Sequence, residues 1–191
     1  MGFNVEFGGD YMINSILKFN KKFVKNELYK PYLTSKYPEK KLAILTCMDT
    51  RLTELLPAAL GIKNGDAKII KNAGGVITHP YGSVMRSLLI ATIELGVKEI
   101  MVIGHTDCGV RGLDGKHMIN ELIKRGISET HIDIIQHTGV HLEEWLSGFE
   151  DDEESVLDTV QCLKTHPLMP KNVVISGFMM DSTTGELTKI T

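Results

Sequence analysis

Short, mostly apolar runs are the clearest pattern along the chain. Three of them cover residues 42–47, 67–71 and 99–104, and a fourth covers residues 172–177. Runs of this length that do not alternate strictly between apolar and polar residues are typical of strands that are covered on both faces, as in a parallel sheet. We therefore expect these four segments to be strands of a mainly parallel sheet.

Helical spacing of apolar residues is found between these runs. Residues 81–95 are followed by Gly96, and Val84, Leu88, Leu89 and Ile93 fall on one face of the predicted helix. Residues 113–166 are expected to be mostly helical as well. Because strands and helices alternate along the chain, the sequence predicts an α/β fold in which a mainly parallel central β-sheet is flanked by helices.

The two ends of the chain carry simpler signals. Residues 9–25 are predicted to form a helix whose last turns are rich in lysine, and residues 26–40, with Pro31 and Pro38, are predicted to be an extended connector. Residues 178–190 are predicted to form a hairpin that turns at residues 183–185. No repeat or flexible linker divides the chain, so we expect one domain over residues 1–191. Within it, residues 1–40 are the N-terminal helix and connector, and residues 41–191 are the α/β core.

Composition excludes several classes of protein. The chain has 191 residues, 42% of them hydrophobic, with a formal net charge of −3 and a sequence pI near 6.2. This charge gives no basic surface for nucleic acid, and no apolar run reaches the roughly 20 residues needed to span a membrane. The three cysteines, without a recognisable signal peptide, favour a reducing compartment, and we expect a cytoplasmic location.

Possible metal ligands follow two of the predicted strands. Cys47 ends the first apolar run, and His105 and Cys108 follow the third. Since ligands bind beyond the carboxyl ends of strands in open α/β sheets, these side chains are expected at one edge of the sheet. Two thiolates and one imidazole are a ligand set that prefers zinc in tetrahedral geometry, and three protein ligands leave a fourth position free, as in catalytic sites. The pattern predicts one Zn²⁺ per chain.

Three motifs in this region resemble those of the β-class carbonic anhydrases. The first, Cys-x-Asp-x-Arg, begins at Cys47, and the last, His-x-x-Cys-Gly, begins at His105. Between them lies Lys-Asn-Ala-Gly-Gly, at residues 71–75. The motifs stand in the family's order, and the resemblance is close over residues 42–109.

The resemblance implies a role for each matching residue. Cys47, His105 and Cys108 would be the zinc ligands, and Asp49 with Arg51 would form a catalytic carboxylate–guanidinium pair. Zinc lowers the pKa of bound water towards about 7, and Asp49 would orient that water while Arg51 holds Asp49 off the metal. Residues without obstructing side chains, or with apolar ones, would bind the substrate; the resemblance and the residue types together suggest Gly74, Gly75, Val76, Leu88 and Gly109.

The implied activity is the reversible hydration of carbon dioxide to bicarbonate and a proton, through zinc-bound hydroxide. The resemblance also implies a homodimer or higher homo-oligomer in which the N-terminal helix reaches across to a partner. Two alternatives stay open. The same fold and zinc site can hydrolyse carbon disulfide or carbonyl sulfide, because an apolar pocket discriminates weakly between such similar molecules. In the other alternative, Asp49 closes the zinc site permanently and the protein is a regulatory protein without hydration activity.

Two further residues have side chains that are capable of chemistry. His79 is the best candidate for a proton shuttle because it follows the glycine segment, although an exposed loop histidine is the simpler interpretation. Cys162 lies on a predicted helical face near Leu157 and Leu163. We expect it to pack in the core and not to bind metal.

Overall fold

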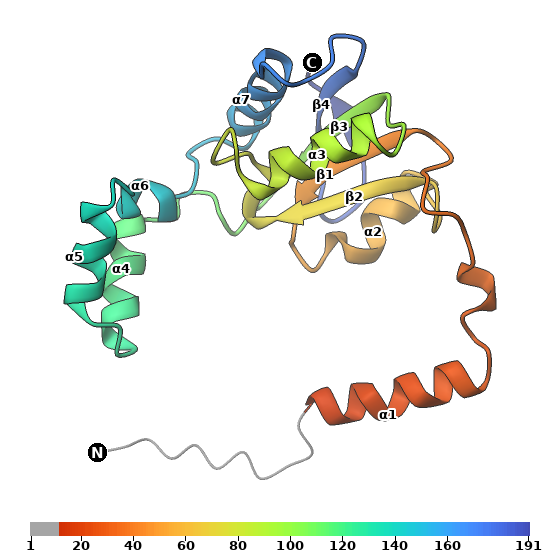
Figure 1. The fold of residues 1–191 in the computed structure, drawn as a ribbon, viewed down its shortest axis with the longest axis horizontal. Coiled ribbons are helices and arrows are strands. Elements are labelled where there is room, and N and C mark those ends of the chain that lie inside the picture. The colour runs from red at the N-terminus through yellow and green to blue at the C-terminus, as the bar shows by residue number, and fades with distance from the viewer. Residues whose placement is uncertain (1–11) are drawn as a thin grey trace. The chain divides into compact units, whose positions relative to one another are not determined.

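A computed structural model describes residues 12–191, and these form two compact units, one that ends at Ser35 and one of residues 36–191 (Figure 1). The described part of the first unit contains helix α1 (Met12–Lys25) and a short 3-10 helix, η1 (Lys30–Tyr32). The predicted start of the helix, at residues 9–11, lies outside the described residues. The prediction of a fully extended connector is wrong at η1, where Pro31 supplies a φ value that suits a helical turn.

The second unit is built on a five-stranded sheet with the order β2-β1-β3-β4-β5. The strands are β1 (Leu42–Cys47), β2 (Ala67–Asn72), β3 (Glu99–His105), β4 (Val174–Met180) and β5 (Leu187–Lys189). The first four pair in parallel, and β5 pairs antiparallel with β4. The predicted mainly parallel sheet and the C-terminal hairpin are therefore confirmed.

The fourth strand differs in its limits from the predicted segment 172–177. It begins at Val174 and continues to Met180, because residues 178–180 pair with residues 103–105 of β3. Before it, the N–H of Val173 donates to the carbonyl of Pro170 in a turn. Pairing with a neighbouring strand, and not the local apolar pattern, sets these limits.

Helices cover both faces of the sheet. Helices α3 (Ser83–Ile93) and α7 (Asp152–Thr165) pack on one face, and α2 (Leu52–Ala59) packs on the other. Helices α4 (Gly115–Lys124), α5 (Glu129–His137) and α6 (Leu142–Leu146) form a separate group beside the sheet, in which α6 contacts both α4 and α5 (Figure 1). The prediction that residues 113–166 are mostly helical is confirmed, and the helix predicted at residues 81–95 is two residues shorter at each end. No helix in residues 12–191 is long and apolar enough to cross a membrane.

Two hydrophobic clusters lie on opposite faces of the sheet. Alternate residues of β1 contribute to different clusters: Ala43 and Leu45 pack with residues of α3 and α7, whereas Ile44 packs with residues of α2. Both faces of the central strands are therefore buried, which explains why their sequences are continuously apolar. Cys162 packs partly buried against the first of these clusters, as expected.

Candidate metal centre

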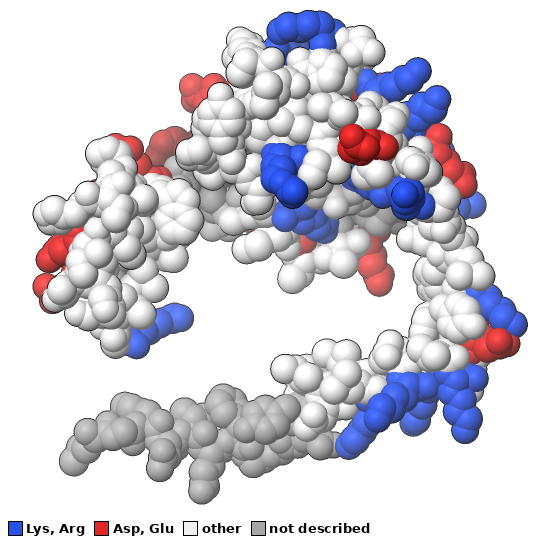
Figure 2. All heavy atoms as spheres, in the orientation of Figure 1, with Lys and Arg blue, Asp and Glu red and all other residues white. Residues whose placement is uncertain are grey.

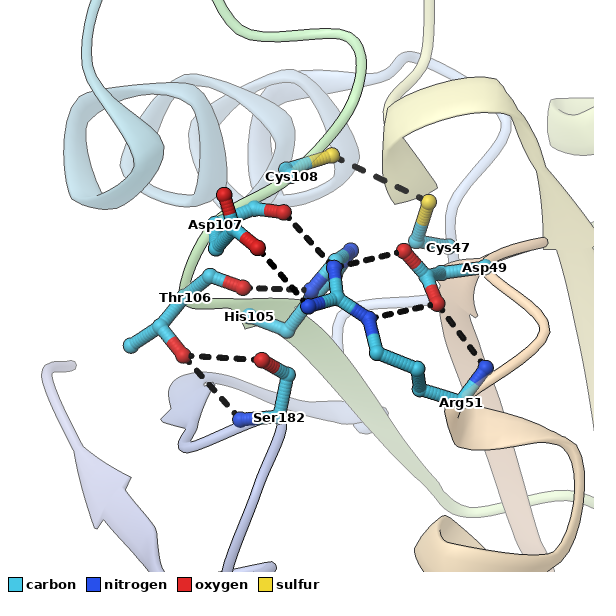
Figure 3. Close-up of polar contacts among 8 residues, drawn as sticks. All are labelled: Cys47, Asp49, Arg51, His105, Thr106, Asp107, Cys108 and Ser182. Atoms are coloured by element: carbon cyan, nitrogen blue, oxygen red, sulfur yellow. Dashed lines mark hydrogen bonds and ion pairs between the residues drawn. The ribbon is translucent and has the colours of Figure 1, made fainter.

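Three potential metal ligands meet where β1 and β3 end (Figure 3). One ligand atom from each of Cys47, His105 and Cys108 lies within 4.8 Å of the other two, and all three residues are buried. Within residues 12–191 no other group of three histidine, cysteine or acidic residues meets this condition. Because β1 and β3 are neighbouring parallel strands, their carboxyl ends bring the two loops to one edge of the sheet.

The donor atoms fit a tetrahedral zinc ion. The sulfur atoms of Cys47 and Cys108 are 3.9 Å apart, and two Zn–S bonds of about 2.3 Å at a tetrahedral angle require about 3.8 Å. The Nδ1 atom of His105 is 2.9 Å from the carbonyl oxygen of Thr106 and donates to it. This leaves Nε2 as the unprotonated nitrogen, and it is buried without a hydrogen-bond partner.

The two thiols differ in acidity. In the metal-free protein burial raises the pKa of the Cys47 thiol, but the His105 imidazole, when it is protonated, and backbone groups of Asp49 and Gly74 more than offset this, so the pKa falls to about 7. Burial raises the pKa of Cys108 to about 11, and the negative charge of Cys47 adds to the increase. The positive charge of a divalent cation between the sulfurs would offset this repulsion and would allow both cysteines to bind as thiolates.

Asp49 is held by Arg51 through both carboxylate oxygens. Nε of Arg51 lies 3.0 Å from Oδ1, and Nη2 lies 2.9 Å from Oδ2; the backbone N–H of Arg51 also donates to Oδ1, at 2.9 Å. These charge-assisted bonds lower the pKa of Asp49 to about 2, so the carboxylate is ionised at neutral pH. The pairing expected from the sequence is present, in its bidentate form.

Glycines of the central motif pack tightly against β1. Gly75 has a φ of +69°, and a Cβ atom there would lie 2.9 Å from the backbone N of Cys47 and from the backbone carbon of Thr46. Gly74 has a φ of +83°, and its Cβ would lie 2.9 Å from the ring of Phe149. The motif therefore supports the backbone that carries the first ligand. By contrast, a Cβ on Gly109 would meet nothing within 4 Å.

A cavity of about 750 Å³ borders the same loops. Val76, expected in an apolar wall, lines it together with Val110 and Phe149. Leu88, expected in the same wall, is instead fully buried in the core and does not line this cavity, because its position on α3 faces the sheet. His79 is exposed, and its Nδ1 accepts a hydrogen bond from the N–H of Tyr81.

The structure adds residues that the sequence did not single out. Asp107 contacts Arg51 through both its carboxylate and its carbonyl group. His166 is buried, and it bonds the carbonyl of Pro80 and the N–H of Leu168. Sequence spacing does not reveal these contacts. Asp107 and Arg51 are 56 residues apart, and His166 and Pro80 are 86 residues apart. The hydrogen bond from Leu168 to His166 depends on a local turn.

Comparison with known proteins shows which family the chain is similar to. The family model for carbonic anhydrase matches residues 42–187. The Bacillus subtilis protein YtiB is 49% identical over 176 residues, which cover 92% of this chain and 94% of YtiB. A carbon disulfide hydrolase from Acidianus is 35% identical over 162 residues, which cover 78% of this chain and 77% of the hydrolase.

A solved structure shows the same fold. The β-carbonic anhydrase isoform I of Trichomonas vaginalis superposes with a TM-score of 0.83 and is 34% identical; the match covers 94% of this chain and 97% of the other. The family model spans all three potential ligands and both members of the carboxylate–guanidinium pair. The chain therefore belongs to the β-carbonic anhydrase family.

Proposed function

We propose that the chain catalyses the reversible hydration of carbon dioxide to bicarbonate and a proton, with one zinc ion held by Cys47, His105 and Cys108. The observation that carries this proposal is the unpartnered Nε2 of His105 between two buried sulfurs, beside an aspartate that Arg51 holds through both oxygens. When bound, zinc supplies the Lewis acidity that makes water nucleophilic near neutral pH.

The residues around the ligands define the rest of the proposed mechanism. Asp49 is ionised and has a fixed orientation, so it can accept a hydrogen bond from the attacking water and direct the oxygen lone pair towards the carbon of the substrate. Arg51 keeps Asp49 in this orientation. Gly109 leaves open space beside the ligand loop, and Val76 provides apolar surface for a linear nonpolar molecule. We propose these residues, with Gly74 and Gly75 as backbone support, as the substrate-binding region.

Metal analysis combined with stopped-flow hydration tests this function. We expect one zinc per chain and measurable hydration between pH 6 and pH 9, and we expect both to be lost in Cys47→Ser. Zinc-loaded wild-type protein without hydration activity would contradict the proposal. If such a protein also showed four protein ligands by X-ray absorption at neutral and alkaline pH, the closed regulatory alternative would hold.

Carbon disulfide or carbonyl sulfide hydrolysis is the second candidate function. The observation that favours it is the similarity to a carbon disulfide hydrolase, whose 35% identity is close to the 34% of the β-carbonic anhydrase structure. Release of hydrogen sulfide from carbon disulfide, measured beside carbon dioxide hydration on the same preparation, separates the two activities. We expect hydration to be the faster reaction.

We also propose that the protein is a homo-oligomer in which α1 contacts a second copy. On α1, large hydrophobic side chains with 54–74% of their surface exposed include Met12, Ile13, Ile16, Leu17 and Phe19, and no residue of the helix is buried. Basic side chains gather along the same helix (Figure 2). An amphipathic helix with its apolar side uncovered is expected to find a partner surface.

Paired substitutions on α1 test this arrangement. Leu17→Glu places a charge on the apolar side, whereas Asn14→Glu places the same charge on the polar side. We expect light scattering to show dissociation of the first variant only. Equal masses for both variants and the wild type would exclude α1 from the interface.

A reducing compartment such as the cytoplasm suits the ligand pair. The sulfur atoms of Cys47 and Cys108 are close enough that a small movement would allow a disulfide, which would destroy the zinc site. We therefore propose a cytoplasmic location, and cell fractionation tests it.

A further inference from the structure

We propose that Asp107 is a positioning residue that fixes the Asp49–Arg51 pair relative to the ligands His105 and Cys108. The proposal rests on the proposed hydration activity. Asp107 lies between these two ligands in the sequence and follows the end of β3. Its side chain points towards the guanidinium group of Arg51 (Figure 3).

The pair is built from a single loop. Asp49 and Arg51 are two residues apart, and their mutual bonds would persist if the whole loop moved. Those bonds alone do not fix where Asp49 lies with respect to ligands on the loop that follows β3. A contact between the two loops must fix the position of Asp49 relative to those residues.

Arg51 makes this contact through Asp107. Nη1 of Arg51 lies 2.8 Å from Oδ2 of Asp107, and Nη2 lies 2.7 Å from the carbonyl oxygen of Asp107. With the two bonds to Asp49, four of the five N–H donors of the guanidinium are used. One planar group therefore joins the loop after β1 to the loop after β3 with a defined orientation.

The backbone of Asp107 is adapted to this contact. Its φ of +56° is in the left-handed region, which few non-glycine residues adopt. The Asp107 side chain is 87% exposed, and exposed ion pairs contribute little stability. The contact therefore contributes little to the stability of the fold. The backbone conformation of Asp107 does, however, direct both its carbonyl and its carboxylate towards Arg51.

Two substitutions separate this role from a structural one. Asp107→Gly accepts the positive φ and keeps the carbonyl contact but removes the carboxylate. Asp107→Asn also tolerates the left-handed region and keeps an oxygen that accepts a hydrogen bond from Nη1, so it is the matched control. Neither change removes a metal ligand.

We expect zinc-loaded Asp107→Gly to keep its zinc and its melting temperature and to lose about 10- to 100-fold in kcat/KM, since small misplacements of a catalytic group have effects of this size. Asp107→Asn should recover most of the activity. In NMR spectra of the same zinc-loaded samples, the side-chain Nε–H signal of Arg51 should be sharp in the wild type and in Asp107→Asn and broadened in Asp107→Gly.

Several results would overturn the inference. Wild-type kcat/KM in Asp107→Gly, an equal loss in both variants, or an unchanged Arg51 signal would each do so. Loss of zinc from Asp107→Gly would assign Asp107 to metal retention instead. A wild-type protein without hydration activity would refute the proposed function, and the Arg51 signal would still report whether Asp107 orders the pair.

Discussion

Replacing Gly75 by alanine is the most direct test of how the metal centre is supported. Gly75 has a φ of +69°, and its Cβ would lie 2.9 Å from two backbone atoms of β1, in Cys47 and Thr46. Backbone atoms within a central strand cannot move aside as a flexible side chain can. The substitution therefore combines a conformational cost with an overlap that must displace Cys47 or the glycine segment.

The size of the effect follows from these two parts. A non-glycine residue in the left-handed region costs about 1–2 kcal/mol, and overpacking in a dense core costs about 1–3 kcal/mol. Gly61→Ala is the matched control, because Gly61 has a φ of +63° but a Cβ there would meet nothing within 4 Å. We expect Gly75→Ala to be less stable than Gly61→Ala by about 1–3 kcal/mol, the overlap part alone.

Urea unfolding of the metal-free proteins measures this difference without the contribution of bound zinc. A competition assay with a chromophoric chelator then measures zinc affinity. We expect Gly75→Ala to bind zinc more weakly than Gly61→Ala, because Cys47 must shift. Equal free energies of unfolding for the two variants would refute the reasoning, since it would mean that the strand adapts to the extra carbon at no cost.

Three further predictions concern single side chains. Cys47→Ser should lose zinc and thermal stability together, whereas Cys162→Ala should keep its zinc, as measured by atomic absorption and calorimetry. In metal-free protein, Arg51 lowers the pKa of Asp49 to about 2, so the pair stabilises the fold above the unfolded-state pKa near 4, and this contribution is lost as the pH falls towards 2. The difference in free energy of unfolding between the wild type and Arg51→Met, measured by urea unfolding at several pH values, should therefore shrink over that range. A constant difference would contradict this prediction. His166→Leu should cost about 1–3 kcal/mol in calorimetry, because its two backbone partners lose their hydrogen bonds, and should leave zinc content unchanged; a loss of zinc would show that this contact extends to the metal site.

The proximity of Cys47, His105 and Cys108 could be predicted because it depends on local features. Cys47 and His105 end apolar runs, and parallel pairing of neighbouring strands places such ends at one edge of the sheet. Spacing alone then brings Cys108 within reach of His105. The contact between Asp107 and Arg51 could not be predicted, since it requires a left-handed backbone at a non-glycine residue, which the sequence pattern does not indicate.

Other features depended on packing between distant segments. The limits of β4 follow from its pairing with β3 and not from its own apolar run. Leucine is an apolar residue that could line a pocket or be buried in the core. Only the position of Leu88 on α3 shows that its side chain is buried in the core. Residue type and position at strand ends therefore predicted which polar side chains lie together, whereas residue type alone did not predict the walls of the pocket.

The order of the strands explains why one small site needs three separate motifs. β2, β1 and β3 are neighbours in the sheet, and each motif follows or ends one of them: the glycine segment follows β2, Cys47 ends β1, and the His105 motif begins at the end of β3. A slip of one residue in either pairing would turn Cys47 or His105 to the opposite face of its strand, and the ligand set would be lost. If zinc binds Cys47, His105 and Cys108 as proposed, its binding energy would favour the native register of β1 and β3, because only that register brings the three side chains together.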